Sequence, residues 1–354
     1  MEELNVIETT IDIVTSIKKK KEKWVKLKSN KGLDEINQVI GQRAKKQASI
    51  AEYLFNNGDT RLKDLIKGLN TSLSTVKALD DKGLIDIYYK ELYRDPLKKD
   101  IAKYDKHILN QEQSRIFNRI LNFSEGDKGG NKFLIHGVTG SGKTEIYLQL
   151  VEEMLRKGKD SIVLVPEISL TPQTIDRFVG RFGENVAILH SRLSQGERFD
   201  QWRSIKQGRV KIAIGARSAV FAPFKNLGLI IIDEEHESTY KSSQNPKYDT
   251  IEVAGKRVEL EGGLLVLGTA TPSLETYYSA LNGEIVLLKL MERVNNLEIP
   301  DIHLVDMREE LKNGNKSIFS SELKNKIEDT LNNKKQVILF LNRRGFSTFV
   351  SCRN

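Results

Sequence analysis

The sequence predicts an α/β protein in which helices cover both faces of a parallel sheet, preceded by a small domain of short helices. Two observations indicate this fold class. Short runs of β-branched and aliphatic residues alternate with stretches of helical periodicity, and several of these runs end in polar or glycine-rich clusters. The runs expected to form strands are 133–135, 162–165, 186–189, 210–214, 229–232, 264–267 and 337–341.

Composition limits the classes of function. The chain has 354 residues, a formal net charge of +8 and a single cysteine, Cys352, which excludes an internal disulfide. No apolar run approaches the ~20 residues of a membrane span. The first residues, Met1-Glu2-Glu3, lack the basic start of a signal peptide. We therefore expect a cytoplasmic protein without a membrane partner, and the positive charge indicates a nucleic-acid partner only weakly.

The first third of the chain changes its pattern near residue 44. Residues 1–43 show a run of lysines that leads into a short strand at about Val25. Residues 44–103 show three helical faces, which Asn57-Gly58 and Gly83 help to delimit, and strand-like residues that we expect to form a hairpin. Three short helices followed by a hairpin is the order of a winged helix. The apolar residues of the three faces lie within 50–55, 62–69 and 73–79.

The third of these helices is the one that enters the major groove in many winged-helix proteins. Here it offers Lys77 and Lys82 beside Asp80 and Asp81, which repel phosphates. The pattern therefore favours a winged-helix fold more than sequence-specific DNA reading.

A glycine-rich loop at 137–144 has the pattern G-x-x-x-x-G-K-[ST]. It lies between an apolar run and an amphipathic segment, which is the context of a phosphate-binding loop. Its glycines let backbone N–H groups converge on phosphate oxygens, its lysine reaches the terminal phosphates, and its last hydroxyl ligates Mg²⁺. A turn without function is the alternative, and the context disfavours it. The expected binding residues are Gly137, Thr139, Gly140, Ser141, Gly142, Lys143 and Thr144.

An acidic cluster follows the run 229–232. In a phosphate-loop protein this position predicts that Asp233 holds Mg²⁺ and that Glu234 polarises the attacking water. His236 is expected to relay the nucleotide state. Thr269 and Thr271 follow another strand, and their hydroxyls are expected to couple to the acidic cluster. Solvated acidic residues are the alternative, which the phosphate loop disfavours.

Further polar clusters follow other strands, at 166–171, 190–192 and 215–218, and Arg198 and Trp202 lie between the last two. Amides, hydroxyls and arginines at several strand ends, among them Arg217 and Ser218, predict a path for the phosphates of a single strand.

Gln113 opens a helix upstream of the phosphate loop. Its amide is both donor and acceptor, which suits an adenine edge, whereas an ordinary surface glutamine is the alternative.

Together with the phosphate loop, the motifs LVPEISLTPQ, LHSRLSQGER, IGARSAVFAPF, DEEH, GTATPS and LNRRGFS resemble those of superfamily 2 helicases. RSAVFAP, DEEHESTYK and LNRRGFSTFV resemble more closely the primosomal protein N′ (PriA) family of bacterial replication-restart helicases, over roughly residues 44–354. Another superfamily 2 fork-remodelling translocase is the alternative within the class. A non-enzymatic DNA-binding scaffold or regulator with a vestigial phosphate loop is the alternative outside it.

The resemblance implies a RecA-like first helicase lobe over 104–290 and the start of a second lobe over 291–354. It implies ATP-dependent 3′→5′ unwinding, with ATP and Mg²⁺ as cofactors, in the cytoplasm and at the nucleoid. Forked and single-stranded DNA, single-strand-binding protein and primosome or helicase-loading proteins are the implied partners. By resemblance, Gln113 reads adenine and Lys143, Asp233 and Glu234 are catalytic. A loop with Tyr240, Lys241, Lys247 and Tyr248 senses single-stranded DNA, and its two tyrosines are expected to stack on bases.

The sequence departs from the family in three places. Thr250-Ile251-Glu252 replaces the usual Ala-Arg-Asp. Residues 1–43 resemble only the tail of the family's N-terminal DNA-binding domain. The chain ends two residues after Cys352, where the family continues into a zinc-binding insertion, and one cysteine does not make the four ligands of structural zinc. We therefore expect an incomplete chain that binds ATP and DNA without zinc and hydrolyses ATP poorly, for lack of the second-lobe arginine.

Overall fold

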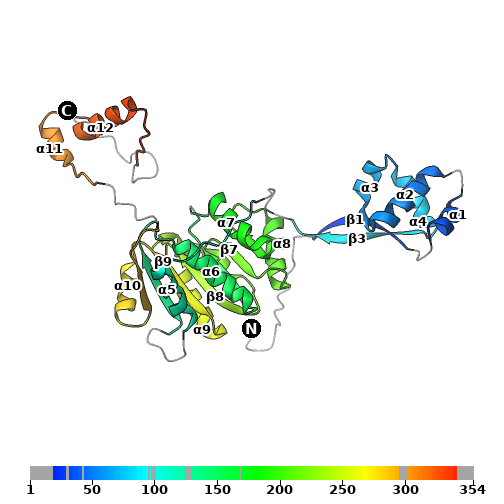
Figure 1. Cartoon of the computed structure of the whole chain (residues 1–354), viewed down its shortest axis with the longest axis horizontal. Coiled ribbons are helices and arrows are strands. Elements are labelled where there is room, and N and C mark those ends of the chain that lie inside the picture. Colours follow the sequence, from blue (N-terminus) through cyan, green and yellow to red (C-terminus); the bar gives the residue numbers. More distant parts are fainter. Residues whose placement is uncertain are drawn as a thin grey trace, which may run out of the picture. The chain divides into compact units, whose positions relative to one another are not determined.

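The structure is a computed structural model that describes residues 19–28, 32–41, 44–94, 96, 101–123, 130–167, 169–294 and 301–340. The chain divides into two compact units, Met1–Asn296 and Leu297–Asn354. The first unit contains a small sheet with short helices and the large sheet that carries the predicted site (Figure 1). Among the helices described, none is long and apolar enough to cross a membrane.

The small sheet is antiparallel and has the strand order β2-β1-β3. Three of its helices are those expected from the helical faces, and the Ser72 side chain caps the last of them by accepting from the Thr75 backbone N–H at 3.3 Å. The elements in chain order are β1 (Lys20–Leu27), α1 (Leu33–Ile40), α2 (Lys45–Asn57), β2 (Thr60–Arg61), α3 (Leu62–Gly68), α4 (Leu73–Asp81) and β3 (Ile85–Leu92).

Two sequence predictions for this region are wrong. Among the described residues β3 forms no hairpin with a following strand: it is the edge strand of the order β2-β1-β3 and pairs along its whole length with β1, from Lys20 opposite Leu92 to Leu27 opposite Ile85. The boundary at 43/44 also fails, since Val25 of β1 and Ile36 of α1 are fully buried in the same core as the later helices. The small sheet therefore needs the segment before residue 44, and the winged-helix assignment stays a prediction.

The large sheet is parallel and has the order β10-β4-β9-β8-β5-β7-β6. Each run predicted between residues 133 and 267 forms a strand, which confirms the predicted α/β fold class with helices on both faces of a parallel sheet. β10 was not predicted, and it pairs with β4 at the edge of the sheet. The strands are β4 (Lys132–Gly137), β5 (Asp160–Leu164), β6 (Val186–Leu189), β7 (Ile212–Gly215), β8 (Leu227–Asp233), β9 (Leu264–Thr269) and β10 (Val286–Leu290).

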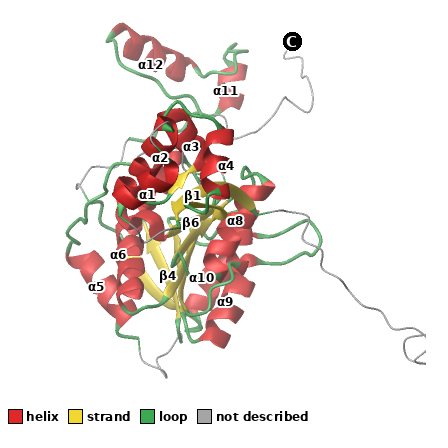
Figure 2. Ribbon diagram, turned by 90° about the vertical axis from the view of Figure 1, so that its right-hand side faces the viewer, coloured by secondary structure: helices red, strands yellow, loops and turns green. Residues whose placement is uncertain are grey.

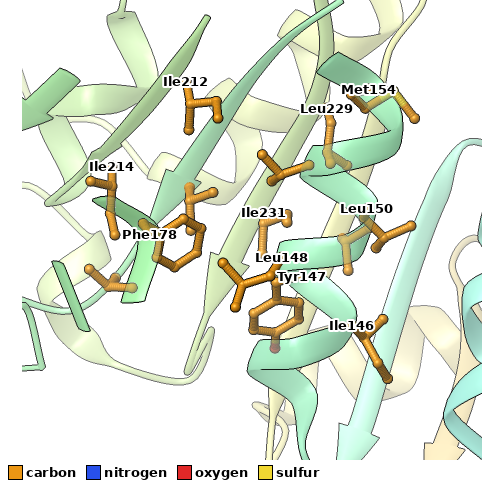
Figure 3. Close-up of a cluster of buried hydrophobic side chains, with 14 of the residues drawn as sticks. Ile146, Tyr147, Leu148, Leu150, Met154, Phe178, Ile212, Ile214, Leu229 and Ile231 are labelled. Atoms are coloured by element: carbon orange, nitrogen blue, oxygen red, sulfur yellow. The ribbon is translucent and has the colours of Figure 1, made fainter. Parts of the chain in front are cut away.

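Helices bury both faces of this sheet, which is why its strands are almost continuously apolar. Strand residues alternate between the faces, so that Phe133 and Leu134 lie in different cores. Figure 2 shows the yellow strands between α5 and α6 on one side and α9 and α10 on the other. In Figure 3, α6 packs over Leu229 and Ile231 of β8. The helices are α5 (Gln111–Leu121), α6 (Lys143–Arg156), α7 (Pro172–Phe182), α8 (Gln195–Lys206), α9 (Thr250–Glu261) and α10 (Leu274–Leu281).

The second unit contains α11 (Met307–Lys312) and α12 (Ser321–Asn332) in its described part. The division at 296/297 falls close to the predicted lobe boundary at 290/291. The strand predicted over 337–341 is wrong for residues 337–340, which are not in a strand, and no other strand among residues 301–340 offers a partner. The motif LNRRGFS and Cys352 lie outside the described residues.

Candidate nucleotide site and nucleic-acid interface

The phosphate loop connects β4 to α6 and is shaped by its glycines. Gly140 and Gly142 both have a φ of +83°, a left-handed conformation that residues with side chains rarely adopt. At Gly137, a Cβ atom would lie 2.9 Å from Ser141 Oγ and 3.0 Å from Leu290 Cβ, which is too close. The loop therefore turns tightly, and α6 begins at Lys143 directly after it.

Lys143 lies buried at the centre of the loop. Its Nζ donates to the Gly137 carbonyl oxygen at 2.8 Å. An ammonium group has three donors, so this bond positions the lysine and leaves donors for phosphate oxygens. The first N–H groups of a helix commonly lack partners within the helix, so the start of α6, where Lys143 lies, suits an anion.

Gln113 is bonded to the phosphate loop in this structure. It is buried, and its Nε2 donates to the Ser141 carbonyl oxygen at 2.8 Å. Its Oε1 accepts from the Asn110 backbone N–H at 2.9 Å, which completes a capping box at the start of α5. Its side chain thus ties α5 to the loop, and adenine reading by Gln113 remains a prediction.

A cavity of about 560 Å³ brings Lys143 and Thr144 together with Asp233 and Glu234. The acidic pair lies at the carboxyl end of β8, the edge at which parallel sheets bind ligands. Burial, followed by the neighbouring charge of Glu234, raises the pKa of Asp233 to about 6. Tyr147 of α6, labelled in Figure 3, donates its hydroxyl to Asp233 Oδ1 at 3.0 Å.

These residues fit Mg²⁺. The Thr144 hydroxyl and the Asp233 carboxylate face one cavity, and oxygen atoms are the ligands that Mg²⁺ prefers. The repulsion between Asp233 and Glu234 is of the kind that a bound dication relieves. Among the described residues, no group of three or more His, Cys, Asp or Glu side chains stands ready for a metal. Mg²⁺ typically binds through one or two protein oxygens together with water and nucleotide phosphates, so the site suits it.

The predicted coupling residues lie next to one another. His236 Nδ1 is 2.7 Å from Thr269 Oγ1 and 3.6 Å from Glu234 Oε2. The Thr271 backbone N–H donates to Thr269 Oγ1 at 3.1 Å, while the Thr271 side chain is exposed. The loop after β9 is thus tied through His236 to the residue expected to activate water.

Glu235, between the predicted catalytic pair and His236, has a structural role that the sequence did not indicate. Its buried carboxylate accepts from the Ser273 backbone N–H at 2.8 Å and from the Ser273 and Thr276 hydroxyls at 3.0 Å. It therefore anchors the N-terminus of α10 to the end of β8.

The predicted DNA residues lie around η3 (Arg217–Phe221) and the loop that begins with η4 (Ser238–Tyr240). Arg217 Nη1 donates to the Thr239 and Lys241 carbonyl oxygens at 3.2 Å, so it holds this loop in place. Ser218, Lys241 and Lys247 are exposed.

The two predicted stacking tyrosines differ. The Tyr248 ring meets the Phe221 ring edge-on, with centroids 5.1 Å apart. Tyr240 is only 2% exposed, and its hydroxyl donates to the Asp233 carbonyl oxygen at 2.7 Å. Its ring is part of the core beneath the loop, so the prediction that Tyr240 stacks on bases is wrong for this structure.

Comparisons with known proteins show what this chain is similar to. A family model described as "Type III restriction enzyme, res subunit" matches residues 106–274. The replication restart protein PriA of Bacillus subtilis is 50% identical over 319 residues, which is 89% of this chain and 40% of the relative. The PriA of Synechocystis sp. is 46% identical over 302 residues, 84% of this chain and 36% of the relative.

The chain is PriA-like. It spans about two fifths of the length of these curated relatives. A solved structure of RecG bound to a three-way DNA junction is 23% identical, with a TM-score of 0.39, and covers 55% of this chain and 24% of that protein. A likeness of this size adds nothing to the sequence match.

Residues that the motifs did not single out also line the nucleotide cavity of this PriA-like chain. Tyr104, His107 and Arg177 line it together with Gln113. The Tyr104 and His107 rings meet edge-on at 5.4 Å. No pattern indicated them, because the segment before α5 has no helical or strand periodicity and Arg177 lies on a helix far along the sequence. Only the tertiary structure brings them together.

Glu145, the residue after the phosphate loop, holds this wall in position. Its Oε1 accepts from the His107 backbone N–H at 3.3 Å, from Gln149 Nε2 at 2.8 Å and from Arg181 Nη2 at 3.3 Å. Glu145 and Arg181 are both buried, so the ion pair is shielded from solvent. The segment that carries Tyr104 and His107 is thus fixed to α6 and α7.

Proposed function

We propose that this chain forms the ATP-binding lobe of an ATP-dependent DNA helicase that acts in replication restart. The observation that carries the proposal is the single cavity in which Lys143 and Thr144 face Asp233 and Glu234. The PriA relatives supply the biological context, because their names assign them to replication restart. Because the chain spans only part of those relatives, their whole activity is a proposal here.

In the proposed mechanism, the loop N–H groups and Lys143 bind the ATP phosphates and withdraw charge from the γ-phosphate. Thr144 and Asp233 hold Mg²⁺, which neutralises charge on the β- and γ-phosphates. Glu234 orients and polarises the attacking water. The contact between His236 and Thr269 then transmits loss of the γ-phosphate to the loop after β9.

Translocation in the 3′→5′ direction, action on forked DNA, and cooperation with single-strand-binding and helicase-loading proteins are proposed from the PriA resemblance. The DNA surface is proposed at Arg217, Ser218, Lys241, Lys247 and Tyr248, at the carboxyl side of the sheet. We further propose that residues 1–354 alone turn ATP over slowly. An arginine contributed by a second lobe is worth ~10³–10⁵ in rate in related phosphoryl-transfer enzymes.

The test is binding of a fluorescent ATP analogue, with and without Mg²⁺. Lys143→Ala is expected to weaken binding by about 10- to 100-fold, because a charge-assisted hydrogen bond is lost. Lys256→Ala is the matched control, since that lysine is 70% exposed on α9 and should leave binding unchanged. Equal affinities for the two variants would overturn the nucleotide site.

Phosphate release with and without single-stranded DNA tests the rest of the proposal. DNA-stimulated turnover that disappears in Lys143→Ala would refute slow turnover by this chain while supporting the helicase assignment. DNA binding that is insensitive to nucleotide would instead favour a non-enzymatic scaffold.

A further inference from the structure

A second cavity, of about 460 Å³, lies at the carboxyl ends of β5, β7 and β6. Its volume falls within the ~300–1,000 Å³ typical of ligand sites. Glu167, Leu189 and Ala216 mark the ends of these three strands in its lining. In the strand order β5 is the neighbour of β8, so this cavity shares a sheet edge with the nucleotide site and is separate from it.

Exposed aromatic side chains line this cavity. Trp202 of α8 is 36% exposed. Phe221 is 45% exposed and is supported edge-on by Tyr248, with ring centroids 5.1 Å apart. Large exposed rings cost hydrophobic free energy unless a ligand covers them, and flat rings favour a flat, unsaturated ligand.

Two arginines give the rim of the cavity its charge. Arg217 is held by the Thr239 and Lys241 carbonyl oxygens, and Arg198 Nη2 donates to the Ser191 carbonyl oxygen at 3.4 Å. The opposing carboxylate, Glu167, accepts a bond from the Ser191 hydroxyl. Burial, together with the Arg192 charge, lowers the pKa of His190, which is therefore neutral at pH 7. The remaining positive charge suits a phosphate beside a ring.

We propose that this cavity receives an unstacked base of single-stranded DNA, with Trp202 and Phe221 against its faces and Arg198 and Arg217 on the adjoining phosphates. An unpaired base exposes a flat apolar face beside a charged phosphate, and this cavity offers both aromatic rings and guanidinium groups. A base inside a duplex is stacked and does not reach the cavity. The inference rests on the proposed DNA function and names the part of the strand that this surface binds.

The base site can be tested by tryptophan fluorescence. The chain has two tryptophans, so Trp24→Phe leaves Trp202 as the only fluorophore of its kind. A thymidine oligonucleotide is expected to quench Trp202 emission as it binds, and an all-abasic deoxyribose-phosphate oligomer is expected to bind without quenching. Fluorescence anisotropy of labelled oligomers measures binding independently.

Substitutions separate the base from the backbone. Trp202→Ala is expected to weaken thymidine-oligomer binding by about 5- to 150-fold, the range for one stacked base, and to leave abasic-oligomer binding unchanged. Trp202→Phe should retain most of the affinity, which shows that loss of the ring and not misfolding is measured. Tyr278→Ala is the matched control, since Tyr278 lies on α10 and is 67% exposed. α10 packs near β10 and β4, which lie at the other end of the strand order from β7 and β6.

The outcomes distinguish this inference from the proposed function. If the thymidine oligomer binds without quenching, and Trp202→Ala matches Tyr278→Ala, the base site is overturned while DNA binding stands. Equal quenching by the abasic oligomer also overturns it, because Trp202 then senses the backbone. If neither oligomer binds at low salt, the DNA function proposed for this chain fails together with the inference.

Discussion

The contact between Tyr147 and Asp233 makes the sharpest prediction about the nucleotide site. Tyr147 is 1% exposed, and its hydroxyl donates to Asp233 Oδ1 at 3.0 Å. Burial, followed by the Asp233 charge, raises the pKa of Tyr147 well above its ordinary value, so the hydroxyl remains a donor. Tyr147→Phe removes this one oxygen and leaves the ring in the core.

We expect the substitution to weaken the binding of Mg²⁺ and to leave the binding of nucleotide in the absence of Mg²⁺ unchanged. A hydrogen bond that orients a metal-binding carboxylate is typically worth about 10- to 100-fold in metal affinity. We expect Tyr147→Phe to reduce by this factor the gain in ATP-analogue affinity that Mg²⁺ provides. Affinity measured in EDTA should stay unchanged, because the Tyr147 hydroxyl donates to Asp233, whereas Lys143 Nζ bonds to the Gly137 carbonyl oxygen.

The assay is titration of a fluorescent ATP analogue at several Mg²⁺ concentrations. Tyr240→Phe is the matched control, since its buried hydroxyl donates to the Asp233 backbone carbonyl at 2.7 Å and not to the carboxylate. It makes the same chemical change at a hydrogen bond to the backbone of Asp233 and leaves the bond to its carboxylate in place. A folded Tyr147→Phe protein that keeps the full Mg²⁺ dependence would show that this hydroxyl does not position Asp233.

Three further predictions concern stability, measured by urea unfolding. Gly268→Ala should lower the free energy of unfolding by about 1–3 kcal/mol, because its Cβ would overlap the Tyr147 hydroxyl. The loss should be smaller in the Tyr147→Phe background, and additive losses would contradict the overlap. Glu235→Gln should lower the free energy of unfolding by about 1–3 kcal/mol, because it weakens the bonds that hold the N-terminus of α10, and it should leave nucleotide affinity unchanged. An unchanged stability would refute the anchoring role. Burial and the Arg192 charge lower the pKa of His190. The unfolded chain therefore takes up that proton first, and the free energy of unfolding falls below about pH 6.5. His190→Gln should lose this part of the acid sensitivity, and an identical pH profile would contradict it.

Local patterns in the sequence were sufficient to predict many of the residues that line the candidate nucleotide cavity. The phosphate loop at 137–144 and the acidic pair Asp233-Glu234 each depend on a few adjacent residues, and the strands before them are apolar because both sheet faces are covered. The pairing of His236 with Thr269 also agrees with expectation, since parallel strands bring their carboxyl ends to one edge.

Contacts between distant segments were not readable in this way. β1 pairs with β3, so that Leu27 lies opposite Ile85, far along the chain. The periodicity of a strand does not specify which strand it pairs with. For the same reason β10 was missed, and residues 337–340 were given a strand although the described part of their unit supplies no partner.

The sequence by itself determined that this chain has a phosphate loop, an acidic pair and a parallel sheet, because each follows from local spacing. Only the tertiary structure decided how side chains are used around them. It placed Tyr147 on Asp233, bonded Gln113 to the phosphate loop, buried Tyr240, and brought Trp202 and Phe221 to the lining of one cavity. The physical reason is that burial and hydrogen-bond partners depend on which elements pack together, and a residue type alone does not fix them.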